Sequence, residues 1–229
     1  MKLIIVLLSL LALNNSYAKE MRQRIVVIDT GLNVVTKILP YLCEDAIYGI
    51  DSEDGTDPHG HGTNIVGIIS KGMNNKKQCI TMIKVPLITI NGATSYNSLA
   101  YIKALEKAVT LEPHLLNLSV AGGSKSMEEE TAIKTMLKNY TTIVIAAGNN
   151  SERLDKHCDL YPQCMKEIYP QIHLVGALTN SKLKLSSSNY GKLVTEWEVG
   201  EDVEGLGISL TGTSQAAAVK SQKLLKEDN

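Results

Sequence analysis

Three residue types that can together cleave an acyl bond occur in distinctive phrases of this sequence. Asp29 ends VVID, His61 lies in HGHGT, and Ser214 lies in GTSQAAAV. A serine hydroxyl is a weak nucleophile until a base takes its proton, and histidine is the side chain that titrates nearest neutrality. A carboxylate on the second ring nitrogen fixes the tautomer of the imidazole and stabilises its cation. These residues could therefore perform nucleophilic acyl transfer if the fold brings them together.

The residues beside Ser214 suit the same chemistry. The sequence predicts a helix over residues 214–225, whose first backbone N–H groups would stabilise negative charge that develops on a substrate. Gly212 lets the chain approach a substrate without a Cβ atom, and Thr213 can cap the helix. Small residues then follow that would let this helix run through the middle of a domain, namely Ala216, Ala217 and Ala218.

Strands and helices alternate along the chain. Apolar runs predict strands over residues 24–29, 81–88, 114–120, 141–148 and 171–178. Apolar residues at three- and four-residue spacing predict helices over residues 63–72, 96–109, 127–137 and 214–225. Because the strands are continuous apolar runs, they are typical of a parallel sheet with helices on both faces. We therefore predict a single α/β domain built on a mostly parallel β-sheet.

This arrangement gathers the polar candidates at one edge of the sheet. In open parallel sheets, functional groups collect at the carboxyl ends of the strands. Asp29, Ser119 and Asn149 each fall at or just after a predicted strand end, while His61 and Ser214 stand at helix starts. We expect these five side chains to converge.

Five phrases, VVIDTG, HGHGTNIVG, LLNLSV, AAGN and GTSQAAA, resemble the signatures of the subtilisin-like serine peptidases and follow that family's order of Asp, His, Asn and Ser. The resemblance implies a subtilisin-like fold and a serine endopeptidase that works through an acyl-enzyme. It implies that Asp29 orients His61, that His61 is the general base and acid, and that Ser214 is the nucleophile. Asn149 would donate a hydrogen bond to the oxyanion.

The resemblance also implies how a polypeptide substrate would bind. An edge segment would pair with the extended substrate as an added strand; it comprises Ser119, Val120 and Ala121. One wall of the pocket for the residue before the scissile bond would consist of Ala146, Ala147 and Gly148. Residues 159–164, DLYPQC, would line the far end of that pocket. Asp159 pointing inward would favour a basic residue and Leu160 an apolar one, and we expect the apolar preference.

The chain departs from the family's pattern at two positions close to these residues. Asn64 stands where the family usually has a second histidine, on the predicted helix and away from the chemistry. Gln215 stands where the family usually has a methionine beside the nucleophile. A polar side chain in this usually apolar place is expected to alter activity modestly.

The first residues have the pattern of a signal peptide. Lys2 precedes a short apolar run, and Ser16-Tyr17-Ala18 offers small residues to a signal peptidase. We expect cleavage after Ala18, so residues 1–18 would be removed from a secreted or periplasmic protein. Residues 19–229 would form the peptidase domain, with a short C-terminal end and no pro-domain. The missing inhibitory segment points to narrow specificity or to a separate protein inhibitor.

The four cysteines are even in number in a chain predicted to be exported, which favours two disulfide bonds. The sequence permits three pairings. We favour Cys158–Cys164, which closes a short loop, together with Cys43–Cys79.

The net charge and the residue spacings limit which ligands and partners can be expected. The net charge of −1 gives no electrostatic reason to expect nucleic acid or an anionic membrane. Asp57, His59 and His61 match no common metal-ligand spacing, and the stretch GMNNKKQ after the predicted helix offers calcium no carboxylate. We expect a polypeptide substrate, no metal and no cofactor.

Two other functions stay open. A catalytically weak or inactive binding protein that keeps the fold is mildly favoured by Gln215 and the short C-terminal end, whereas the complete set of Asp, His, Asn and Ser opposes it. A small-molecule esterase would carry a G-x-S-x-G elbow, which Ser214 lacks.

Overall fold

The structure is a computed structural model that describes residues 22–51, 54–90, 93–120, 123–155 and 158–228. The predicted signal peptide (residues 1–18) and the candidate substrate-binding residue Ala121 lie outside the described residues. Among the helices that the structure describes, none is long and apolar enough to cross a membrane.

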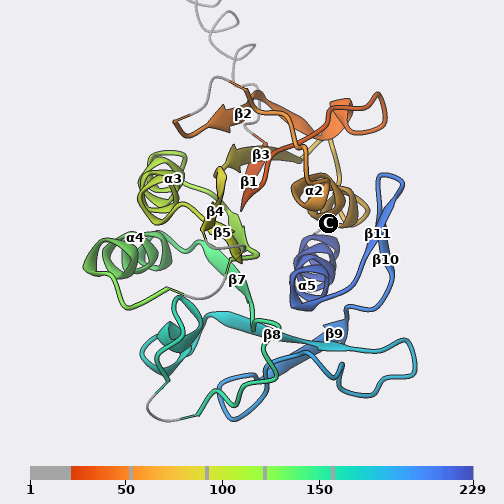
Figure 1. The fold of residues 1–229 in the computed structure, drawn as a ribbon. Helices are drawn as coiled ribbons and strands as arrows, with labels where there is room; N and C mark the ends of the chain where they lie inside the picture. The colour runs from red at the N-terminus through yellow and green to blue at the C-terminus, as the bar shows by residue number, and fades with distance from the viewer. Residues whose placement is uncertain (1–21, 52–53, 91–92, 121–122, 156–157, 229) are drawn as a thin grey trace, which may run out of the picture.

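A seven-stranded parallel sheet forms the centre of a single domain (Figure 1). Its strands are β1 (Gln23–Asp29), β2 (Leu42–Gly49), β3 (Gln78–Lys84), β6 (Leu115–Leu118), β7 (Thr142–Ala146), β8 (His173–Leu178) and β9 (Glu196–Val199). They lie in the order β2-β3-β1-β6-β7-β8-β9, with every neighbouring pair parallel. Because β1 lies between β3 and β6, the chain builds the sheet outward on both sides of β1. The carboxyl ends of the strands beside such a point are where α/β proteins bind ligands.

Two helices cover each face of the sheet (Figure 1). One face carries α2 (His61–Ser70) and α5 (Thr213–Glu227), and the other carries α3 (Ser98–Thr110) and α4 (Met127–Lys138). The fully buried side chains of β1 alternate between the two faces, with Ile25 and Val27 toward one core and Val26 and Ile28 toward the other. This double burial explains why the strands are continuous apolar runs.

Helix α5 is buried along its first half. Its most enclosed side chains are Ala216, Ala217 and Ala218, each with no exposed surface. They pack in the same core as Ile65 and Ile69 of α2. The prediction that this alanine run lets the helix pass through the domain agrees with its burial.

Short elements complete the domain. Two antiparallel hairpins are formed by β4 (Leu87–Ile90) with β5 (Ala93–Tyr96) and by β10 (Val203–Gly205) with β11 (Ile208–Leu210). Two short 3-10 helices are η1 (Leu39–Tyr41) and η2 (Gln163–Glu167). The β10–β11 hairpin lies on the outer side of α2 and α5 (Figure 1).

The strand predicted over residues 81–88 is wrong in its extent. It joins the end of β3 to the start of β4, whereas the structure separates them at Val85 and Pro86. Proline has no N–H to donate to a ladder, so an apolar run through it does not continue one central strand. The helix predicted from residue 96 begins at Ser98, because the Asn97 side chain accepts the N–H of Ala100 at 3.0 Å and caps it.

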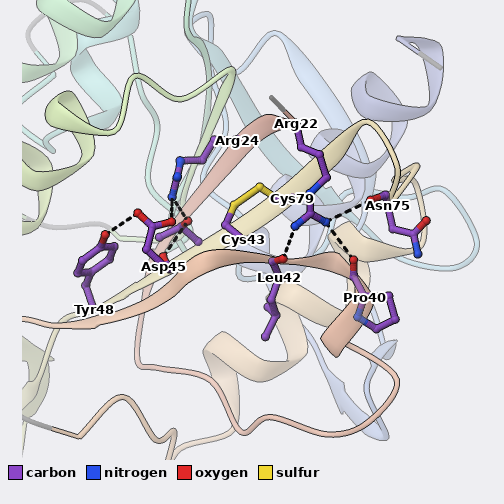
Figure 2. The surroundings of a disulfide bond; sticks show 10 residues. Arg22, Arg24, Pro40, Leu42, Cys43, Asp45, Tyr48, Asn75 and Cys79 are labelled. Carbon is purple, nitrogen blue, oxygen red and sulfur yellow. Dashed lines mark hydrogen bonds and ion pairs between the residues drawn. A yellow bond between two sulfur atoms is a disulfide. The ribbon is translucent and has the colours of Figure 1, made fainter. Parts of the chain in front are cut away.

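Two disulfide bonds are present, and they are the pairs that the sequence favours: Cys43–Cys79 and Cys158–Cys164. The first joins the edge strand β2 to β3 (Figure 2). Beside it, the Arg22 guanidinium donates to the carbonyl oxygens of Pro40, Leu42 and Asn75 at 2.7 to 3.1 Å. His61 lies between Cys43 and Cys79 in the sequence. The disulfide therefore links the two ends of the segment that contains the histidine.

Candidate active site

Asp29 and His61 form a hydrogen-bonded pair at the carboxyl edge of the sheet. Asp29 is the last residue of β1 and has no exposed surface, and His61 is the first residue of α2. Asp29 Oδ1 lies 2.7 Å from His61 Nδ1 and accepts the N–H of Thr30 at 2.7 Å. A carboxylate on Nδ1 leaves Nε2 as the ring nitrogen that can take a proton.

Opposing effects act on the pKa of His61. Burial lowers this pKa because it penalises the charged imidazolium, whereas the Asp29 carboxylate and, more weakly, Asp57 raise it. The carboxylates prevail, so the pKa of His61 lies above its ordinary value of 6.5. The ring therefore accepts a proton more readily than a free imidazole does.

Asp57 organises the loop that leads to His61. Its Oδ1 accepts hydrogen bonds from the Thr30 hydroxyl at 2.8 Å and the Gly60 N–H at 2.9 Å. Its Oδ2 accepts the N–H of Thr63 at 2.8 Å and the hydroxyl of Thr63 at 2.7 Å. The buried carboxylate thus satisfies N–H groups at the start of α2 that have no partner within the helix. The sequence analysis did not assign this helix-capping role to Asp57, although a carboxylate shortly before a predicted helix is a signal for it.

The start of α5 is tied to the end of β7. Thr213 Oγ1 accepts the Gly148 N–H at 3.0 Å, and the Thr213 N–H donates to Asn149 Oδ1 at 2.9 Å. Ser214 follows as the second residue of α5, with only 7% of its surface exposed. Asn149 is exposed, and its Nδ2 donates to none of the residues that the structure describes. This amide is free to donate to a ligand near Ser214.

A buried amide pair joins α2 to α5. Gln215 Nε2 donates to Asn64 Oδ1 at 3.0 Å, and both residues are at most 2% exposed. Asn64 Nδ2 in turn donates to the carbonyl oxygens of Val203 at 3.0 Å and Ile208 at 2.7 Å, in the β10–β11 hairpin. The two residues that depart from the subtilisin-like pattern are therefore joined by a hydrogen bond, and Asn64 also ties α2 to the hairpin.

This amide pair holds the starts of the two helices side by side (Figure 1). Asn64 follows His61 by about one turn of α2, and Gln215 follows Ser214 directly. Within the described part of the chain, no hydrogen bond joins His61 Nε2 to Ser214 Oγ. Hydrogen bonds between base and nucleophile are commonly long before a substrate binds.

The amide pair gives a stability prediction. Gln215→Leu leaves Asn64 Oδ1 buried without a donor, which is expected to lower the free energy of unfolding by about 1–3 kcal/mol. Together with Asn64→Leu and the double variant, urea unfolding gives a double-mutant cycle. We expect a coupling free energy of about 1 kcal/mol or more, because removing both amides leaves no unpaired partner between them. Strictly additive effects would show that the two amides do not act as a pair.

The candidate substrate-binding residues lie at the ends of adjacent strands. Ser119 and Val120 follow β6, and Ala146, Ala147 and Gly148 end or follow β7. Gln163 bridges the two groups, because its Nε2 donates to the backbone oxygens of Val120 and Ala146 at 2.8 Å each. The sequence prediction included Gln163 only as part of the stretch 159–164.

Gly148 is required by its surroundings. Its φ is +99°, and a Cβ atom at this position would lie 2.5 Å from Asn189 Nδ2 and 3.4 Å from Leu160 Cδ2. Leu160 therefore lies against the predicted pocket wall, while Asp159 is exposed. Which of these two side chains faces a bound substrate stays a prediction.

Tyr96, which the sequence prediction did not single out, contacts the Asp29 carboxylate. Its hydroxyl donates to Asp29 Oδ1 at 3.4 Å, and burial raises the pKa of Tyr96 well above 10.0. The second carboxylate oxygen, Oδ2 of Asp29, is buried and accepts no hydrogen bond from the described residues. The tyrosine ends β5, so the β4–β5 hairpin reaches the site.

The described residues contain no group of three or more His, Cys, Asp or Glu side chains that could hold a metal ion. The structure places the Asp29 carboxylate against the His61 imidazole, and it places the Asn149 amide against the start of the helix that carries Ser214. Such a set suits acyl transfer by proton transfer and hydrogen bonding.

Comparison with known proteins gives the class. A solved structure, a cold adapted subtilisin-like serine proteinase, superposes with a TM-score of 0.71 at 21% identity and covers 90% of this chain and 76% of that chain. The fold is thus subtilisin-like, as the sequence resemblance implies. The model of the subtilase family matches residues 23–225, and the chain belongs to this family.

Curated relatives are distant in sequence and longer. A subtilisin-like protease of Coccidioides posadasii (strain C735) is 27% identical over 203 residues, which are 83% of this chain and 48% of the relative. An extracellular serine proteinase of Thermus sp. (strain Rt41A) is 28% identical over 149 residues, 64% of this chain and 34% of the relative. The chain thus spans half or less of the length of these relatives.

Proposed function

We propose that this chain is a serine endopeptidase that hydrolyses polypeptides through an acyl-enzyme. In this proposal Asp29 orients His61, His61 is the general base and acid, Ser214 is the nucleophile, and Asn149 stabilises the oxyanion. The observation that carries the proposal is the 2.7 Å contact between the fully buried Asp29 carboxylate and His61 Nδ1. Membership of the subtilase family supports it.

The proposed reaction has two halves. His61 Nε2 takes the Ser214 proton as Oγ attacks the substrate carbonyl carbon, and the oxyanion accepts hydrogen bonds from Asn149 Nδ2 and from the first N–H groups of α5. The imidazolium then protonates the amine as the C–N bond breaks. Water, deprotonated by the same ring, attacks the acyl-enzyme, and the ring returns the proton to Ser214 as the acid product leaves.

We propose that the substrate binds as an extended strand along Ser119, Val120 and Ala121. The residue before the scissile bond would lie against Ala146, Ala147 and Gly148. The contact of Leu160 with this wall supports an apolar preference at that position. A separate protein inhibitor would be a further partner.

We also propose that the protein is exported. Residues 1–18 have the pattern of a signal peptide, and structural disulfide bonds are typical of oxidising compartments. The near-zero net charge gives no electrostatic reason to expect nucleic acid or an anionic membrane surface as a partner.

Labelling with a fluorophosphonate probe tests the proposed function. The probe reacts with a serine hydroxyl that an adjacent base activates, so the folded protein is expected to take up one probe per chain, with the label on the peptide that carries Ser214. Heat-denatured protein is the control and should take up none. Folded protein that stays unlabelled would favour a binding protein that keeps the subtilase fold without the chemistry.

Asn149 gives a kinetic prediction. Asn149→Ala removes the proposed donor to the oxyanion and is expected to lower kcat by about 10²–10³-fold with KM little changed, a magnitude borrowed from subtilisin. Steady-state hydrolysis of a peptide substrate measures this change. Asn149→Asp should lose a comparable amount, although it keeps an acceptor for the Thr213 N–H. The neighbouring Asn150→Ala is the matched control; a loss of equal size there would remove the case for Asn149 as a donor.

A further inference from the structure

A cavity of about 470 Å³ lies on the side of the sheet covered by α3 and α4. Its walls come from the β4–β5 hairpin, the first half of α3, the segment after β6 and the first turn of α4, with Tyr96, Tyr101, Val120 and Glu129 among its lining residues. Neither Asp29 nor His61 lines this cavity, and none of the proposed proton transfers takes place in it.

Glu129 is a nearly buried carboxylate in the wall of this cavity. Only 3% of its surface is exposed. Its Oε1 accepts the Tyr101 hydroxyl at 2.8 Å, and no hydrogen bond from the described residues reaches its Oε2. No ion pair to Glu129 is formed within the described part of the chain; the nearby Lys125 pairs with Glu130 instead, at 3.0 Å.

A carboxylate in this setting lacks the partner that buried charges normally have. Carboxylates are almost never fully buried unless they are paired, because removing the charge from water is costly. Burial raises the pKa of Glu129 to about 7, although the hydrogen bond from Tyr101 acts in the opposite direction. A cation that entered the cavity would restore the charged form and supply the missing donor to Oε2.

The cavity adjoins the proposed path of the substrate on two sides. Val120 lines it and also belongs to the candidate edge segment. Tyr96 lines it and reaches Asp29 through its hydroxyl. Alternate side chains of an extended polypeptide point to the same side of the strand. A polypeptide paired along Val120 can therefore direct a side chain into this cavity while its backbone continues toward Ser214.

We propose that the cavity binds a basic side chain of the polypeptide substrate and that Glu129 accepts its charged hydrogen bond. This inference rests on the proposed endopeptidase function and adds a specificity-determining residue to it. The remaining lining residues are apolar or hydroxyl-bearing and would pack along the aliphatic stem of lysine or arginine.

The test compares pairs of fluorogenic peptides that differ at one position, with lysine in one and its neutral isostere norleucine in the other. One pair is made for each position before the scissile bond, and kcat/KM is measured for each. At one position we expect the lysine peptide to be cleaved about tenfold or more faster, as a charged hydrogen bond allows. Glu129→Gln should reduce this ratio toward one while cleavage of the norleucine peptide stays unchanged.

The controls separate the two proposals. Glu128→Gln removes a charge from an exposed site on the same turn of α4 and should leave the ratio intact. Cleavage without a lysine preference at any position, or a preference that Glu129→Gln leaves unchanged, would overturn the inference and leave the endopeptidase function standing. Cleavage of no peptide, together with no fluorophosphonate labelling, would overturn the endopeptidase function itself and this inference with it.

Discussion

Ser214→Ala is expected to lower kcat for peptide hydrolysis by about 10⁶-fold, the largest effect of any single substitution. The magnitude is borrowed from subtilisin, where removing the nucleophile costs nearly as much as removing the whole triad. The fold should be unaffected, because the Ser214 side chain makes no hydrogen bond to the described residues and alanine is already the residue type at the next enclosed positions of α5.

The matched control is Ser221→Ala, about two turns further along the same helix. Its hydroxyl donates to Asn117 Oδ1 at 2.9 Å in the core. Losing this buried hydrogen bond should lower the free energy of unfolding by about 1–3 kcal/mol while kcat stays close to that of the unmodified chain. Hydrolysis rates and urea unfolding curves, measured on both variants, distinguish an effect on the catalytic step from an effect on the free energy of unfolding. Full activity in Ser214→Ala would place the nucleophile elsewhere.

Asp29→Asn is expected to lower kcat by about 10⁴-fold, a magnitude taken from other serine triads. The amide is nearly the same size as the carboxylate, so the buried site should stay filled. Its N–H₂ can face His61 Nδ1 and would then hold the ring in the wrong tautomer, with the proton on Nε2. Without the negative charge, the imidazolium that forms during the reaction also loses its main stabilising partner.

The pH profile of the same variant carries a second expected result. Activity requires the neutral ring, so kcat/KM rises with pH through the pKa of His61, which lies above 6.5 in the unmodified chain. Burial lowers this pKa and the Asp29 carboxylate raises it. Removing the carboxylate leaves the lowering effect of burial, so the midpoint of the profile should move to lower pH. Asp51→Asn, at an exposed ion pair with Lys103, is the control and should not move it; an unchanged midpoint in Asp29→Asn would contradict the assignment.

The central strands and the four helices were predictable because burial on two sides imposes a simple pattern. Strand β1 reads as an uninterrupted apolar run, and both of its faces pack in a core. The edge strands β2 and β9 were missed, since each has a neighbour on only one side and carries polar residues at positions that a central strand fills with apolar ones. Strand β2 also changes register against β3 between Leu42 and Ile47, which interrupts any regular pattern.

Each predicted catalytic residue lies in a short sequence motif, and for this reason it could be identified from the sequence. Glu129 could not be identified from the sequence. Acidic residues at a helix start, as in MEEE, are usually exposed to solvent, where they interact favourably with the helix dipole. Helical spacing offered a signal: Glu129 shares a face with Ala132, Ile133 and Met136, which are all buried. The hydroxyl of Tyr101, a residue of another helix, completes the environment, and no local pattern reveals that contact.

The hydrogen bond between Gln215 and Asn64 has a consequence for how this chain can change over generations. Replacing Gln215 alone by the methionine usual in the family leaves Asn64 Oδ1 buried without its donor, so this single step is penalised. Replacing Asn64 as well removes the unpaired acceptor, but it also removes the donor to the carbonyl oxygens of Val203 and Ile208. In a mutational library at the two positions, an apolar residue at position 215 should be better tolerated when position 64 changes with it than when Asn64 is kept.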